Sequence, residues 1–160
     1  MDMFSKSKYD GIRDAINSGV VSNDDVFVNG MFRQTVGQTI LKSSGAIGGA
    51  IGGAVGFGLA GISKLDGKFV VFGLKQDKLI IFVSSPTLFS SKYKTGNFFT
   101  VSKTDILSLE VIKKSKSLVV TIHFVDTKKP KVVDLKMIDK TQDISVAYDM
   151  FNRFWKESEE

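Results

Sequence analysis

Several residue types are absent from this sequence or scarce in it. Among 160 residues there is no cysteine, and there are two prolines, one tryptophan and one histidine. Without cysteine the chain has no disulfide, no thiolate metal ligand and no cysteine nucleophile. His123 has no second histidine or cysteine with which to share a metal ion, and on a strand it is best explained as a partly exposed side chain. We therefore predict no catalytic residues, no metal site, no cofactor and no enzymatic activity.

Two further absences bear on location and partners. The first eight residues are polar and lack the apolar run of a secretory signal, which predicts a cytoplasmic protein, possible also at the inner face of the cell membrane. The net charge is +5 and is carried mostly by lysine. Basic patches that are rich in arginine or interleaved with aromatic residues, typical of nucleic-acid binders, are missing, so we expect no nucleic-acid partner. A lysine-rich surface suits an anionic membrane leaflet.

More than half of the 15 glycines lie in one segment, 45–61, and no charge occurs between Lys42 and Lys64. A four-residue unit repeats there, and on a helix it drifts by only ~40° per repeat. Small residues then form stripes beside an apolar ridge, the pattern that lets two helix backbones approach closely. The predicted contact residues are Gly45, Gly48, Gly49, Gly52, Gly53 and Gly56 on the stripes and Ile47, Ile51 and Val55 on the ridge.

This segment resembles the glycine zippers of channel-like and pore-associated proteins. Each glycine costs about 1 kcal/mol relative to alanine in a helix, so close packing or a lipid environment must compensate. Three interpretations stay open: a flexible linker, a buried helix or helical hairpin, and a membrane-inserting segment, since 43–63 has about the 20 residues that a bilayer needs.

Outside this segment, period-two apolar patterns predict antiparallel strands and two helical stripes. A short amphipathic helix within 5–17 is expected to dock on the domain edge, and Asn29-Gly30 is expected to end the first strand. Helical spacing in 31–44 predicts a lead-in to the glycine segment, and 86–96 is expected to be a polar loop. The expected strands are 26–28, 68–74, 78–84, 97–102, 106–113, 118–125 and 132–137, followed by a helix over 144–155.

Three stretches carry a family resemblance: FVVFGLKQDKLIIF at 69–82, FFTVSKTDILSLEV at 98–111 and AYDMFNRFW at 147–155. Together they resemble pleckstrin-homology (PH)-like domains, in particular bacterial PH-like and GRAM-like domains. The resemblance implies a single α+β domain over 1–160, an antiparallel β-barrel or sandwich of six or seven strands capped by a C-terminal helix. A glycine-rich helical insertion, 30–64, would then separate strands one and two. Both its ends would return to the same side, which disfavours a single membrane crossing.

The basic loops are predicted to contact an anionic surface through Lys92, Lys94, Lys113, Lys114 and Lys116. Taken together, these features predict a non-enzymatic interaction protein whose insertion contacts a membrane or a glycine-zipper partner helix. One version is an immunity protein against a membrane-active toxin. The alternatives are a peripheral lipid-binding protein and a homo-oligomer that associates through its zippers.

Overall fold

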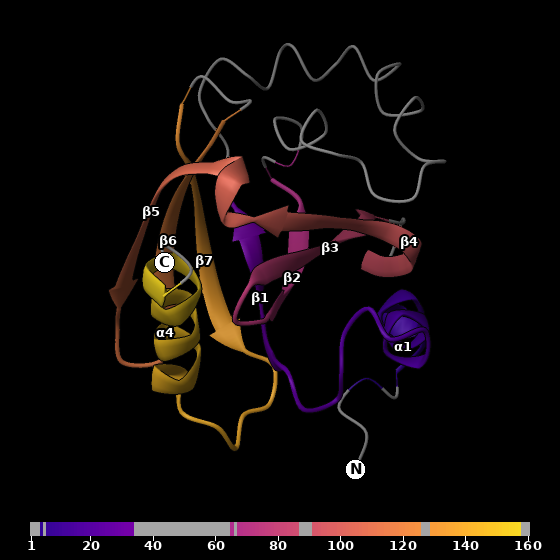
Figure 1. Ribbon diagram of the computed structural model, residues 1–160. Helices are drawn as coiled ribbons and strands as arrows, with labels where there is room; N and C mark the ends of the chain where they lie inside the picture. Colours follow the sequence, from indigo (N-terminus) through magenta and orange to yellow (C-terminus); the bar gives the residue numbers. More distant parts are fainter. Residues whose placement is uncertain are drawn as a thin grey trace.

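A computed structural model describes residues 4, 6–33, 65, 67–86, 91–125 and 129–157. These residues form seven strands, two α-helices and three short helical turns (Figure 1). In chain order the elements are η1 (Ser7–Tyr9), α1 (Asp10–Asn17), β1 (Val26–Phe32), β2 (Phe69–Leu74), β3 (Lys78–Pro86), β4 (Ser91–Ser102), η3 (Lys103–Asp105), β5 (Ile106–Lys113), β6 (Leu118–Phe124), β7 (Lys131–Met137), α4 (Ile144–Asn152) and η4 (Arg153–Glu157).

The seven strands make one antiparallel sheet in the order β4-β3-β2-β1-β7-β6-β5. An α+β fold with a C-terminal helix is therefore confirmed. Among the described residues β4 and β5 are the two ends of the sheet, so the expected closed barrel is wrong and the sheet is open. A barrel would require a ladder between these end strands, and the chain passes from one to the other through η3 instead.

One face of the sheet, which we call the inner face, carries the larger core. Strands β6 and β7 alternate strictly between buried and more exposed positions, as a sheet with one covered face requires. Helix α4 contacts β1, β2, β5 and β7 and buries Ile144, Ala147 and Phe151 on this face (Figure 1). Asp143 caps its first turn by accepting a hydrogen bond from the backbone N–H of Ser145 at 3.4 Å. The C-terminal helix thus closes the inner face, as the sequence predicts.

The opposite, outer face is covered by α1 where β1 to β4 lie. A second core there joins Phe4, Ile12 and Ala15 to sheet residues such as Phe27 and Phe82. Because both faces of β2 are covered, five of its six residues are buried and its sequence is almost continuously apolar. The predicted helix docked on the domain edge is confirmed, and Gly19, with φ of 87°, lies just beyond its end.

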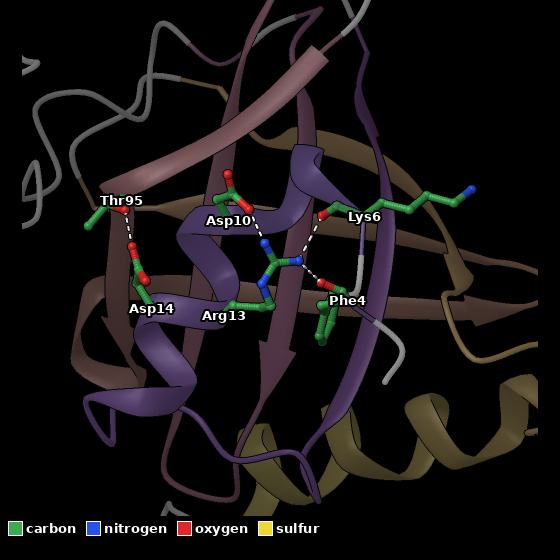
Figure 2. Close-up of polar contacts among 6 residues, drawn as sticks. All are labelled: Phe4, Lys6, Asp10, Arg13, Asp14 and Thr95. Atoms are coloured by element: carbon green, nitrogen blue, oxygen red, sulfur yellow. Dashed lines mark hydrogen bonds and ion pairs between the residues drawn. The ribbon is translucent and has the colours of Figure 1, made fainter. Parts of the chain in front are cut away.

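Polar contacts hold the N-terminal segment in this position (Figure 2). The guanidinium of Arg13 donates to the backbone oxygens of Phe4 and Lys6 and pairs with Asp10. The hydroxyl of Thr95, on β4, donates to Asp14 of α1. The segment that precedes α1 is therefore tied to the helix, and the helix is tied to the end strand β4.

Strand β1 is longer than the sequence suggests. Asn29-Gly30 is a turn signal, yet the strand continues through Met31 and Phe32. The expected insertion boundary at residue 30 and the helical assignment of Met31 and Phe32 are therefore wrong. Long-range pairing overrides the local signal, because β1 forms ladders with β2 on one side and β7 on the other. Strand β3 also extends to Pro86 and β4 begins at Ser91, so most of the expected polar loop is strand.

Gly30 provides a test of this close strand pairing. A Cβ placed on Gly30 would overlap the backbone carbonyl of Asp134 on β7, an obstacle that no side-chain rotation removes. We expect Gly30→Ala to lower the free energy of unfolding by about 2–4 kcal/mol. Gly73→Ala is the control, since its Cβ would meet only side-chain atoms, at 3.2 Å, and should be milder. Equal urea-unfolding midpoints for the two variants would contradict the close approach.

Candidate interaction surface

The segment 34–64 leaves and re-enters the sheet through a closed stem. The backbone N–H of Arg33 donates to the oxygen of Val132 at 2.8 Å, and that of Gly67 donates to the oxygen of Phe32 at 2.8 Å. Gly67 has φ of 80°, a backbone conformation that favours glycine, and it lets the chain turn into β2. The side chain of Leu65 is buried in the inner core. Both ends of the segment are thus fixed next to each other, at the ends of two neighbouring antiparallel strands.

An ion pair on the outer face reinforces this stem. Nε and Nη2 of Arg33 donate to Oδ2 and Oδ1 of Asp134, each at 2.9 Å, so the contact is bidentate. The hydrogen bond from Arg33 lowers the pKa of Asp134 below its ordinary value of 3.8, and the charge of Lys114 lowers it further. The same hydrogen bond raises the pKa of Arg33. Both side chains are about half exposed, so the pair contributes modestly to stability.

Beside this ion pair lie two exposed apolar side chains. Met31 on β1 and Phe69 on β2 are directly opposite each other in the ladder and are 39% and 45% exposed. Met31 is also opposite Asp134 on β7. We call Met31, Phe69, Arg33 and Asp134 the stem patch. The other large exposed apolar side chains of the described residues are Leu107 and Ile112 on the end strand β5 and Val125 directly after β6.

The lysines predicted to contact an anionic surface are not gathered in one place. Lys92 and Lys94 lie near the start of β4, and Lys92 is exposed. Lys113 ends β5, and Lys114 and Lys116 lie in the turn to β6, at the opposite end of β6 from its connection to β7. The end of β1 and the start of β4 lie at the same end of the sheet. Of the five predicted lysines, only Lys92 and Lys94 therefore lie at the end from which the segment 34–64 departs.

The predicted zipper residues, Gly45 to Gly56 with Ile47, Ile51 and Val55, all lie outside the described residues. None of the helices that are described has both the length and the apolar character needed to cross a bilayer. The zipper prediction and its membrane and partner-helix versions therefore remain predictions.

The described part of the chain includes the single histidine of the sequence and most of its carboxylates. No group of three or more histidine, cysteine, aspartate or glutamate side chains in that part of the chain could hold a metal ion. His123 lies half-buried on β6, on the same face as Val119 and Thr121, which matches the expected placement.

Sequence reasoning missed Met31 and Phe69 as surface residues. The sequence pattern predicts a helix at Met31 because Asn29-Gly30 is a turn signal, and it predicts an ordinary strand position for Phe69. Extending the period-two pattern of Phe27 and Asn29 to Met31 would have placed all three on one face. Which part of that face stays uncovered depends on where α1 docks, and the local sequence does not specify this.

No family model, no curated protein and no solved structure matches this chain. The resemblance to PH-like domains is therefore a prediction from the quoted stretches of sequence, and the function has to be argued from the surface itself.

The Arg33–Asp134 pair predicts a pH-dependent contribution to stability. Because the pKa of Asp134 is lowered in the folded state, the contribution is present above pH 3.8 and is lost as the pH falls through the folded value. Asp134→Asn should lower the free energy of unfolding by roughly 0.5–1 kcal/mol at neutral pH. Below the folded pKa the variant and the unaltered protein should unfold at nearly the same urea concentration.

Arg33→Gln, alone and combined with Asp134→Asn, separates the pair from other effects of each substitution. The two single changes and the double change should then cost about the same. Additive losses, or a loss that persists unchanged in acid, would show that the two side chains are not coupled.

Proposed function

We propose that this chain is a non-enzymatic interaction protein that presents the segment 34–64 to a membrane or to a glycine-zipper helix of a partner. The sheet and its two helices form the base, and the stem patch lies where the segment meets that base. We further propose a PH-like domain, supported by seven antiparallel strands followed by a C-terminal helix that packs on their inner face.

The observation that carries this proposal is the closed stem. Since β1 and β2 are neighbours and pair through Met31 and Phe69, both ends of the segment start from one edge of the sheet. A segment held in this way contacts a partner or a bilayer and returns to the side from which it came. This arrangement favours a re-entrant or in-plane contact over a single crossing, for which the two ends would have to lie on opposite sides of the bilayer.

The composition of the segment supports the same proposal. Between Lys42 and Lys64 it has no charge, and its glycines recur at a spacing that suits close approach of a second backbone. An immunity protein that binds a glycine-rich helix of a membrane-active toxin is one concrete form. A peripheral lipid-binding protein and a homo-oligomer formed through the zippers are the other two, and each predicts a different measurement.

Bulky substitutions on the glycine stripe test the proposal. Gly49→Leu with Gly53→Leu should reduce binding to vesicles or co-purification with a partner by at least about tenfold, because the added side chains hold the second surface away. Ala50→Leu with Ala54→Leu adds the same side chains one position along the predicted helix and is the matched control. It should retain more of the binding than the glycine variant.

Three readouts on the full chain separate the forms of the proposal. Flotation with liposomes in the absence of protein partners supports the lipid-binding form. Co-purification without flotation supports a partner helix, and a larger particle in mild detergent supports self-association. If the glycine variant equals the unaltered protein in all three readouts, the contact through the zipper is wrong.

A further inference from the structure

The stem patch lies where the cover of the outer face ends. Along β1, Phe27 is buried by the segment around α1, Asn29 is half-buried, and Met31 is exposed. Along β2, Val71 is buried in the same outer core, while Phe69, two residues earlier, is exposed. These side chains share one face because residues two apart on a strand point the same way. Burial on the outer face therefore ends one side-chain position before β1 and β2 reach the stem.

The exposure of Met31 and Phe69 differs from that of a scattered surface residue. Single exposed apolar side chains are common and need no explanation, whereas contiguous ones mark contact surfaces. Cross-strand partners have Cβ atoms about 5 Å apart, so these two side chains form one continuous apolar surface. This apolar surface lies directly beside both ends of the segment 34–64. A membrane or partner that contacts the segment there is therefore brought close to Met31 and Phe69.

The charges around this apolar pair are mainly basic. Arg33 follows Met31 by two residues on the same face, and Lys68 directly precedes Phe69. Lys92 at the start of β4 and Lys129 before β7 are exposed at the same edge of the sheet. The acidic member of the stem patch, Asp134, is neutralised by Arg33. A methionine and an aromatic ring at an end of the sheet that also carries these lysines match the boundary between acyl chains and anionic headgroups.

We infer that Met31 and Phe69 are the apolar part of a membrane-docking surface, with Lys68, Lys92 and Lys129 beside anionic headgroups. This inference rests on the proposed function and specifies its partner as an anionic lipid bilayer. The sheet itself, and not only the segment 34–64, contacts the bilayer. The end of the sheet that carries the stem faces the lipid, while the turn with Lys114 and Lys116 lies at the other end of β6.

The decisive comparison uses two pairs of exposed apolar residues in the full chain. Met31→Thr with Phe69→Thr removes the apolar surface of the stem patch and keeps residues that suit strands. Leu107→Thr with Ile112→Thr is the control for the loss of exposed apolar surface elsewhere on the sheet, because these side chains are 59% and 50% exposed and lie on β5, three strands away from β1. Binding is measured by flotation with phosphatidylcholine vesicles that contain or lack phosphatidylglycerol, and thermal unfolding verifies that each variant is folded.

We expect the unaltered protein to float with the vesicles that contain phosphatidylglycerol. The Met31 and Phe69 variant should bind them at least about tenfold more weakly, since two side chains no longer enter the lipid. The control should stay within about twofold of the unaltered protein. Lys68→Gln should weaken binding by about fivefold on phosphatidylglycerol vesicles alone, because one headgroup attraction is lost.

The same assay with Gly49→Leu and Gly53→Leu separates this inference from the proposed function. If the glycine variant loses binding while the Met31 and Phe69 variant does not, the docking surface is wrong and the function of the segment stands. Equal losses in the stem variant and the β5 control would also overturn the docking surface. If the unaltered protein co-purifies with a partner but never floats, the bilayer is the wrong partner and the zipper-helix form of the function remains.

Discussion

The pairing of β1 with two neighbours at once holds this structure together. Its residues Val28 to Met31 are hydrogen-bonded into ladders with β2 on one side and β7 on the other. Since β2 leads to β3 and β4, and β7 leads to β6 and β5, this one strand joins the two halves of the sheet. Gly30 stands at the centre of the contact, where the β7 backbone leaves no room for a side chain. Both cores, and the stem of the segment 34–64, depend on this double ladder.

The two faces of the sheet then acquire different roles. On the inner face α4 and the sheet bury one continuous core, which includes Phe72, Leu135 and Phe151. On the outer face α1 covers the half formed by β1 to β4. Tyr9, directly before this helix, stacks on Tyr93 of β4 with ring centroids 5.7 Å apart and helps to fix the helix there. The uncovered remainder begins at the stem. A partner that approaches this edge meets the end of β1, the start of β2 and the segment between them.

The elements that the sequence predicts well are those specified by local periodicity. Strands β6 and β7 alternate cleanly, and the stripe from Ile144 to Phe151 marks the C-terminal helix. The end of β1 could not be predicted in this way, because Asn29-Gly30 is a turn signal in isolation and the ladders with β2 and the distant β7 keep it extended. Lysine-rich turns are evident in the sequence as well. That Lys92 and Lys114 lie at different ends of the sheet follows only from the strand order.

The ladder between β1 and β2 can close over a long connection of almost any composition. The free-energy cost of closing a loop rises by only about 0.6 kcal/mol for each doubling of its length, so the ladder between β1 and β2 tolerates a long connection. A connection of glycine, serine and charged residues would close the stem equally well and would stay soluble. The chain instead carries an uncharged stretch rich in isoleucine, valine and glycine between Lys42 and Lys64. Apolar surface of this extent is a liability in water unless something covers it. Folding of the sheet does not require this composition, and the contact that we propose beyond the sheet would account for it.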